Sequence, residues 1–385
     1  MQRRDAIRTL TLSAAASAAA ISTSACAPQA CSSICFPQTT EEIAAKVFPS
    51  NQAYCPGDIR RYHAGGTDWT GALASLRTVG AHGLACFIPK GTYSYRVSPN
   101  WAVAGLDLTG ERGTILEHTG TGVAFNMDCG ATGAVIDGLV ISNLIIKGNA
   151  ATTDGVYSRG IVRSLFRMIE VRGCSGKAFH IRHGVSNHYD TCIVSTNVAP
   201  WKIYPTHAFY LSNNGAGYYT AGCTFTNCIG EGFPGKGCAL ADASGNTFVG
   251  GTFEKVEIGL DIDTDDCRRN RFVSVWFEAN SVADARIKGV GNSFSNCYFG
   301  SSSSGPTVLN STGAATLFEG GFIRVIAQKN TARDTLFTGV VFSNHPALGV
   351  VGSSSYRMVG CTEADKNLDV TTSLPDHQVR TAEST

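Results

Sequence analysis

The chain has 385 residues and a formal net charge of +1, with only 16% charged side chains. This near balance argues against a basic surface for nucleic acid, and beyond the segment that ends at Ala27 no apolar run reaches the length that a bilayer requires. Glycine, with 43 residues, exceeds its usual share, which suits a fold with many tight turns. We therefore expect no nucleic-acid partner and no transmembrane segment.

The segment 1–27 is interpreted as an export signal. A twin arginine at positions 3 and 4 precedes a modest, alanine-rich apolar stretch from Thr9 to Ile21. This order is typical of a twin-arginine signal peptide, with an ordinary secretory signal as the alternative. Ala25-Cys26-Ala27 offers a small-residue cleavage site, and Cys26 also stands in a poor lipobox, so lipid anchoring through Cys26 is a second hypothesis. The prediction is an exported protein, periplasmic or extracellular.

The segment that follows the signal is expected to be irregular before the fold begins. Residues 28–57 contain proline, serine and cysteine and show no period, so they are interpreted as a linker or lead-in. A helix is expected from Thr70 to Arg77, with Asp68 or Thr70 as its cap. Residues 85–97 and 106–116 are each predicted to form two strands separated by a glycine-containing turn.

Three motifs between residues 58 and 120 occur in a fixed order. They are Asp68-Trp-Thr70-x-Ala72-Leu73, then Phe87-Ile-Pro89-x-Gly91-Thr92-Tyr93, then Leu108-x-Gly110-x-x-Gly113-Thr114-Ile115-Leu116. This series resembles the opening of the pectate lyase superfamily and of phage tailspike-like β-helices. The resemblance implies a helix that caps the first coil and a Pro-x-Gly-x-Tyr turn that starts it. It implies no single activity, because the superfamily includes lyases, hydrolases, epimerases and proteins without known catalysis.

A short sequence pattern, which contains an aromatic residue that we call the lead residue, recurs through the second half of the chain. From Phe225 onward the step from one lead residue to the next is nearly constant, and a second aromatic usually follows five positions later. Such a period without a helical pattern predicts a solenoid built from short strands and tight turns. We expect an all-β, single-stranded, right-handed parallel β-helix with a short N-terminal capping helix. The lead residues are Tyr189, Phe225, Phe248, Phe272, Phe294, Phe318, Phe337 and Met358, and the second aromatics are Phe253, Phe277, Phe299 and Phe342.

The same period predicts two further columns in the stack. Asparagines two positions before the lead aromatic would form a ladder whose amides cover open backbone groups. Cysteines three positions after it would form a buried thiol column, while a disulfide is more plausible among the cysteines outside the repeat. The asparagines are Asn187, Asn246, Asn270 and Asn292, and the cysteines are Cys192, Cys228, Cys297 and Cys361. The expected organisation is a signal peptide (1–27), a lead-in (28–57), a β-helix domain (58–370) and a flexible C-terminal tail (371–385).

One coil is longer than its neighbours. The step from Tyr189 to Phe225 exceeds the next step, from Phe225 to Phe248, and the added residues fall in 198–207 and 213–219. Insertions leave a solenoid as loops, often on its binding face. Aromatic faces stack on sugar rings, although such a loop can also pack on its own coil. The candidate substrate-binding residues are Trp201, Tyr204, His207, Tyr218 and Tyr219.

A second set of strands lies between the lead aromatics. We align 178–182, 208–212, 238–242 and 259–263, and strand alternation then sends two rows of side chains outward. One row holds His180, Tyr210, Leu240 and Asp261. The other holds Arg182, Ser212, Asp242 and Asp263, with Asn126, Asp128, Arg286 and Lys288 continuing the two rows. The candidate catalytic residues are His180, Arg182, Tyr210, Asp242, Asp261 and Asp263.

Two mechanisms fit this patch. In a lyase acting on a uronic acid polymer, Arg182 would neutralise the substrate carboxylate, while His180 or Tyr210 removes the neighbouring proton or protonates the leaving oxygen. In a glycoside hydrolase, two of the three aspartates would act as acid and base or nucleophile. We therefore expect cleavage of an acidic or complex polysaccharide. The alternatives are a non-catalytic carbohydrate-binding or envelope-associated β-helix, and a solvated sheet face without a site.

No metal or other cofactor is expected. The aspartates at positions 261, 263, 265 and 266 could hold Ca²⁺, an oxygen-seeking ion that the resemblance associates with pectate lyase relatives. This cluster lacks the spacing of a family site, so calcium is kept only as an alternative. Cys-x2-Cys spacings are absent, which argues against structural zinc.

Overall fold

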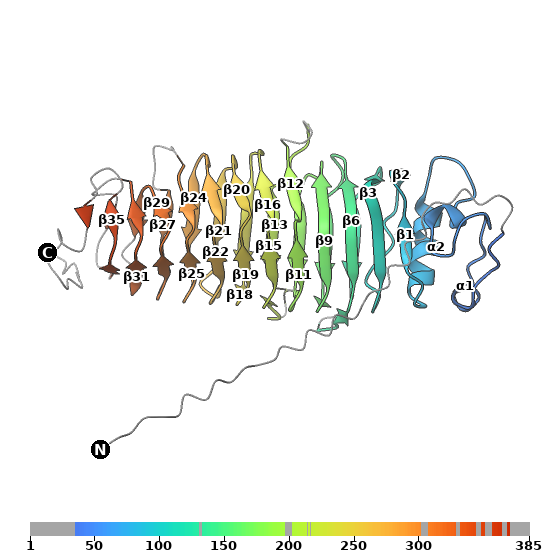
Figure 1. Ribbon diagram of the computed structural model, residues 1–385, viewed down its shortest axis with the longest axis horizontal. Helices are drawn as coiled ribbons and strands as arrows, with labels where there is room; N and C mark the ends of the chain where they lie inside the picture. The colour runs from blue at the N-terminus through green and yellow to red at the C-terminus, as the bar shows by residue number, and fades with distance from the viewer. Residues whose placement is uncertain are drawn as a thin grey trace, which may run out of the picture. The chain divides into compact units, whose positions relative to one another are not determined.

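The computed structural model describes residues 35–130, 133–196, 202–213, 215, 217–301, 307–328, 332–343, 348–350, 356–363 and 368–369. Within these ranges the chain winds as stacked rungs of short parallel strands (Figure 1). The right-handed parallel β-helix expected from the sequence is confirmed. Cys26 and the signal peptide of residues 1–27 lie outside the described residues, as does the tail 371–385. In the described part of the chain, none of the helices has the length and hydropathy of a membrane span.

Three short helices stand at the N-terminal end of the coil. They are α1 (Thr40–Ala45), the 3-10 helix η1 (Ile59–Tyr62) and α2 (Thr70–Gly80). The predicted capping helix is α2, but its N-cap is Trp69 rather than Asp68 or Thr70. The carboxylate of Asp68 instead accepts a hydrogen bond from the backbone N–H of Thr70 at 2.9 Å, so it satisfies one of the open donors of the first turn.

Helix α1 lies within the segment interpreted as a lead-in, and a buried ion pair fixes it to η1. Thr39 and Glu42 form a capping box that starts the helix. The Glu42 Oε1 atom lies 2.6 Å from Nε of Arg61, and both side chains are fully buried. Tyr62 donates its hydroxyl to the same Oε1 atom at 2.8 Å. This carboxylate is therefore satisfied by a cation and a phenol.

The larger sheet of the coil has 22 strands and forms two sides of most rungs. The first coils use long strands that bend from one side to the other, and later coils use two short strands. The long strands are β3 (Asp107–His118), β6 (Val140–Lys147) and β9 (Leu165–Arg172), after β1 (Cys86–Ile88) and β2 (Gly91–Tyr95). The lead aromatics lie on β11 (His188–Asp190), β15 (Thr224–Thr226), β19 (Thr247–Val249), β22 (Arg271–Val273), β25 (Ser293–Ser295), β28 (Leu317–Glu319), β31 (Thr335–Thr338) and β34 (Tyr356–Val359). The second column comprises β12 (Ile193–Ser195), β16 (Ile229–Glu231), β20 (Thr252–Glu254), β23 (Trp276–Glu278), β26 (Tyr298–Phe299), β29 (Phe322–Ile323), β32 (Val341–Phe342) and β35 (Thr362–Glu363). The last strand of this sheet, β36 (Leu368–Asp369), pairs antiparallel with β35.

The other large sheet has ten parallel strands, one from each successive rung. Its strands are β4 (Phe125–Asp128), β7 (Asp154–Arg159), β10 (Lys177–Arg182), β13 (His207–Ser212), β17 (Lys236–Ala241), β21 (Ile258–Ile262), β24 (Ala283–Ile287), β27 (Val308–Asn310), β30 (Ile326–Gln328) and β33 (Leu348–Val350). Two pairs of short strands form small sheets at one corner, β5 (Ile136–Asp137) with β8 (Ile161–Val162) and β14 (Thr220–Ala221) with β18 (Ala243–Ser244).

The predicted columns stack as the period requires. Phe225, Phe248 and Phe272 pair in register, and their rings stack with centroids 4.4 and 4.8 Å apart. In the asparagine ladder, Asn270 Oδ1 accepts hydrogen bonds from both the backbone N–H and the side-chain amide of Asn246, each at 3.1 Å. These interactions satisfy buried polar groups at a corner where the sheet ladder is interrupted.

The thiol column is also confirmed, since its four predicted members, Cys361 among them, are all buried. Cys192, Cys228 and Cys297 are buried free thiols, and burial raises the pKa of Cys297 to about 12. Cys86, considered for a bridge from its place outside the repeat, is likewise a buried free thiol whose Sγ donates to Leu76 O at 3.3 Å. Cys26 and Cys31, considered with it, lie outside the described residues.

Candidate functional site

The outer surface of the ten-stranded sheet carries an in-register row of polar and aromatic side chains. Strand pairing places Tyr157, His180 and Tyr210 on three successive rungs. Arg182 lies two positions further along β10, level with Ser212, as the sequence alignment predicts. The full row, from β4 to β27, is Asn126, Tyr157, His180, Tyr210, Ala239, Asp261, Arg286 and Leu309.

The predicted alignment of strand β17 is wrong by one residue. Ala239, rather than Leu240, continues the row of His180, and Leu240 is fully buried among the inward side chains. Asp242 accordingly lies one residue beyond the strand, at a positive φ of 59°. The physical reason is Cys238, a small apolar residue that takes an inward position in place of a phenylalanine on the preceding rung.

His180 is held by a carboxylate that the sequence reasoning missed. Asp154 Oδ2 lies 2.9 Å from Nδ1 of His180, and Asp154 Oδ1 accepts a hydrogen bond from the backbone N–H of Lys177 at 3.0 Å. Burial alone would raise the pKa of Asp154, but the hydrogen bonds and charges of His180 and Lys177 outweigh it and the pKa lies below its usual value. Because an ionised carboxylate only accepts, the Nδ1 atom carries the proton, and Nε2 of a neutral His180 is left as a base.

Aromatic rings surround this imidazole. The rings of Tyr157 and Tyr210 lie 5.1 and 5.3 Å from that of His180, centroid to centroid. Burial, together with the negative charge of Asp263, raises the pKa of Tyr210, so its phenol keeps its proton at neutral pH. The His180 side chain is 13% exposed, so a small part of it is accessible.

His207 extends the cluster from the opening residue of β13. Its ring lies 5.0 Å from that of Tyr210. Burial, with the positive charges of Lys236 and Lys177, lowers the pKa of His207 to about 4, so it is neutral at pH 7. The Nζ atom of Lys177 lies 5.5 Å from the centroid of the Tyr210 ring, within cation–π range.

Arg182 is fixed beside the row by two contacts. Its Nε atom donates to the backbone carbonyl of Asn213 at 3.2 Å, and Nη1 lies 3.5 Å from the hydroxyl of Tyr157. The planar guanidinium is therefore oriented, which suits recognition of a carboxylate.

Each of the three aspartates proposed as catalytic carboxylates is engaged by another side chain. Asp261 is 4% exposed, so little of it is open to a substrate. The pairs are Asp261 with Lys236 (2.5 Å), Asp263 with Lys288 (3.5 Å) and Asp242 with the amide of Asn213 (2.6 Å).

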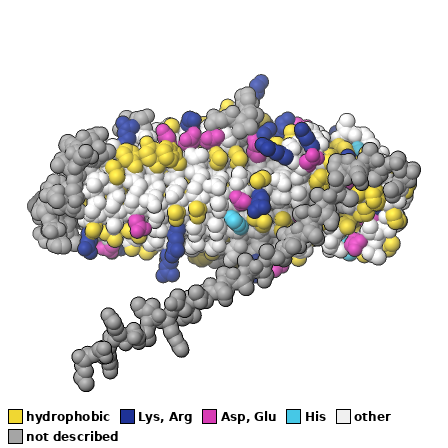
Figure 2. Space-filling view, in the orientation of Figure 1, with side chains coloured by type: hydrophobic (Ala, Val, Ile, Leu, Met, Phe, Trp, Pro, Cys, Tyr) yellow, Lys and Arg dark blue, Asp and Glu magenta, His cyan; other side chains and the backbone are white. Residues whose placement is uncertain are grey.

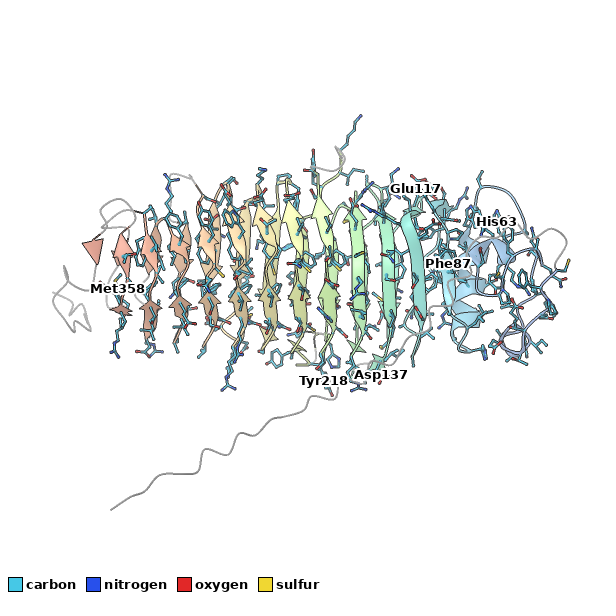
Figure 3. The ribbon with its side chains drawn as sticks, viewed as in Figure 1. His63, Phe87, Glu117, Asp137, Tyr218 and Met358 are labelled. Atoms are coloured by element: carbon cyan, nitrogen blue, oxygen red, sulfur yellow. The ribbon has the colours of Figure 1, made fainter. Side chains whose placement is uncertain are left out.

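The aromatic residues of the long coil do not form one group. Trp201 lies outside the described residues. Tyr204 and His207 come before or at the start of β13, whereas Tyr218 and Tyr219 follow its end, so they flank opposite ends of the strand. Tyr218 contacts the ring of His183 at 4.9 Å, and Figure 3 places it beside Asp137 at the lower edge of the coil.

Among the described members of the predicted binding set, only His207 has a ring contact with the patch. His207 contacts Tyr210, while Tyr204, Tyr218 and Tyr219 are exposed by 41, 46 and 40%. Strand β13 separates the two predicted segments of the insertion, in which residues 198–201, 214 and 216 lie outside the described residues.

A usable signal existed for the missed residues. The segment 154–159 reads Asp-Gly-Val-Tyr-Ser-Arg, with alternating side chains, and Tyr157 precedes His180 by one period of the repeat. Extending the alignment one rung toward the N-terminus would have found both Tyr157 and Asp154.

Among the residues that the structure describes, no three His, Cys, Asp or Glu side chains gather as they would around a metal ion. The four aspartates of residues 261–266 point to different partners. Asp266, for example, pairs with Arg268 at 3.2 Å.

The chain matches no protein-family model, and no curated protein is similar to it in sequence. Solved structures do resemble it. The A-module of the Azotobacter vinelandii mannuronan C-5 epimerase AlgE6 has a TM-score of 0.61 at 12% identity, covering 80% of this chain and 94% of that chain. The AlgE4 A-module of the same organism has a TM-score of 0.54 at 12% identity, over 80% and 96%.

A phage protein is similar to about the same degree. ORF18 of Geobacillus virus E2 has a TM-score of 0.53 at 14% identity, covering 80% of this chain and 62% of that chain. At identities this low, the structural similarity shows a shared fold alone. The chain accordingly has the fold of the right-handed, pectate-lyase-like parallel β-helices, as the motifs of residues 58–120 predicted.

Proposed function

We propose that this protein is an exported polysaccharide lyase that cleaves a uronic acid polymer on the outer surface of the ten-stranded sheet. The observation that carries the proposal is the contact between Asp154 and His180, with an oriented Arg182 on the same strand. Removal of a proton next to a carboxyl group needs a base, here His180 oriented by Asp154, and a fixed cation, here Arg182, that binds the carboxylate.

The proposed reaction begins with the substrate carboxylate bound by Arg182. The positive charge lowers the cost of the negative charge that develops when the neighbouring C5 proton leaves. Nε2 of His180 takes that proton, and Asp154 stabilises the imidazolium that forms. Tyr210, whose raised pKa keeps it protonated, donates its proton to the glycosidic oxygen as the C4–O bond breaks. The products are a new chain end and an unsaturated uronate.

The contacts within the site favour this reaction over hydrolysis. A hydrolase needs a free acid and a free nucleophile or base, yet Asp261 is paired with Lys236 and largely buried. The side chains of the row also touch one another, as His180 and Tyr210 do. Mutual contacts and an imidazole–carboxylate pair support a catalytic site rather than a merely solvated or binding face.

Epimerisation is a second candidate, favoured by the fold shared with the two mannuronan C-5 epimerase modules. Removal of the C5 proton is common to both reactions. They differ in whether the carbanion then expels the C4 oxygen or receives a proton on the opposite face.

An exported location supports either activity. The twin arginine and apolar stretch of residues 1–27 are arranged as in an export signal, with Cys26 as the site of an alternative lipid anchor. A polymeric substrate is met outside the cytoplasm, so this interpretation and the proposed activity agree.

The test is incubation of the purified protein with polymannuronate, polyguluronate and polygalacturonate in D₂O. Elimination would give ultraviolet absorbance from unsaturated ends, and epimerisation would give deuterium at C5 without new ends. Asp154→Asn and His180→Ala should each lower kcat by roughly 10²- to 10⁴-fold, and Asp190→Asn is the matched control. Asp190 pairs with Arg167 at 2.9 Å on the 22-stranded sheet, so its loss should leave kcat unchanged.

The possible results separate the competing functions. Reducing ends without absorbance or deuterium would replace the lyase by a hydrolase. Binding of a polymer without any product would favour the non-catalytic alternative. Full activity of Asp154→Asn would show that the site lies elsewhere.

A further inference from the structure

A stack of aromatic side chains stands on the outside of the 22-stranded sheet, away from the site above. Trp276, Tyr298 and Phe322 pair in register on β23, β26 and β29. Their ring centroids lie 4.1 and 5.1 Å apart, with interplanar angles of 21° and 16°. Figure 2 shows hydrophobic side chains gathered over these strands, with acidic side chains at the edge of the band.

At one end of this stack an aromatic face is covered by no other described ring. Trp276 is 45% exposed although Tyr298 stacks on one side of its indole. On the other side the residue in register is Thr252, and no described ring packs there. Tyr298 lies between two rings, and Phe322 has the branched side chain of Val341 in register on its far side. Trp276 therefore combines the largest ring with the smallest in-register neighbour, Thr252.

Three carboxylates run beside this open face. Glu231, Glu254 and Glu278 end β16, β20 and β23 and lie in register, so neighbouring members are about 4.8 Å apart along the coil. Glu278 accepts a hydrogen bond from Nε1 of Trp276 at 2.6 Å. One lysine, Lys255, pairs with Glu254 at 3.1 Å. The three carboxylates, with Lys255 paired to one of them, give this strip a local excess of negative charge.

We propose that Trp276, Glu254 and Glu278 bind an amine-bearing sugar, a hexosamine residue of a glycan with free amino groups. The apolar side of a pyranose ring fits the indole face. Its ammonium group is attracted both by that face and by the carboxylates. A polyuronate would be repelled here, so this site would recognise a glycan of the opposite charge. The inference does not depend on the activity proposed above.

The test is a calorimetric titration of the full protein with oligoglucosamine, with its N-acetylated counterpart and with oligolysine. Oligoglucosamine should bind in a saturable way, and Trp276→Ala should weaken it about tenfold or more. Glu278→Gln should also weaken it, while retaining the amide as a partner for the indole. Circular dichroism melting curves establish that each variant is folded, as expected for substitutions at this surface.

His180→Ala provides the control, since it alters the other sheet and should leave oligoglucosamine binding unchanged. Unaltered affinity in Trp276→Ala would overturn the proposal, as would the absence of saturable binding. Equal binding of the N-acetylated chain would contradict the role of the amine. Equal binding of oligolysine would identify a basic protein segment as the ligand instead.

Discussion

The half-buried imidazole of His207 should make this protein lose stability in mild acid. Its pKa in the folded chain is about 4, against an ordinary value of 6.5. Below pH 6.5 the unfolded chain therefore binds a proton that the folded chain does not accept until about pH 4. The free energy of unfolding must fall as the pH drops through this window, and the contribution of His207 is complete at pH 7.

The size of the loss follows from the difference between the two pKa values. Full titration of a gap from 6.5 to about 4 corresponds to about 3 kcal/mol, since one pKa unit is worth about 1.4 kcal/mol. At pH 5 the unfolded state is almost fully protonated at this site and the folded state is not. By that pH about 2 kcal/mol should already be lost.

The assay compares urea unfolding at pH 7 and pH 5 for the natural chain and for His207→Gln. The drop in unfolding free energy between the two pH values should be about 2 kcal/mol smaller in the variant. Other acid-sensitive groups, such as Asp154 with its lowered pKa, contribute to both proteins and cancel in the comparison. His82→Gln, at an exposed position, controls for the loss of an imidazole. Equal pH dependence in the natural chain and His207→Gln would refute the reasoning.

Two further predictions concern the stability of the coil and of its N-terminal helices. Phe272→Ala should cost about 3–5 kcal/mol, because this fully buried ring stacks between Phe248 and Phe294; thermal melting would measure it, and a loss within error would argue against a tightly packed column. Glu42→Ala should cost about 3–5 kcal/mol by leaving the buried Arg61 without its carboxylate. The urea midpoint should fall accordingly, and an unchanged midpoint would show that the N-terminal helices unfold separately from the coil.

The period alone was sufficient to predict the columns of the coil. Phe272 and its neighbours recur at a nearly constant step and stack as expected, because a solenoid converts distance along the chain into distance between rungs. The asparagine ladder followed for the same reason. The polar rows of β10 and β13 were also placed correctly, since Phe179 and Phe209 mark the inward side of their strands.

The register of β17 was predicted wrongly because this strand has no large inward residue like Phe179 or Phe209. In β17 the inward residues Cys238 and Leu240 alternate with the small residues Gly237, Ala239 and Ala241. Alternation therefore does not distinguish the two possible registers. The role of Asp154 could not be read from spacing within its own strand. Its oxygen reaches His180 across a rung boundary, between the start of one strand and the middle of the next.

The helices at the N-terminal end also cover the first rung of the coil. Strand β1 pairs with β3 on one side, and on its other side Phe87 donates its N–H to the carbonyl of Gly57 while α2 packs against Cys86. A bare terminal rung would offer its backbone donors and acceptors to any incoming chain. Removal of the residues before 86 should therefore expose the backbone donors and acceptors of β1 to other chains. We expect such a truncated protein to assemble end to end into fibres.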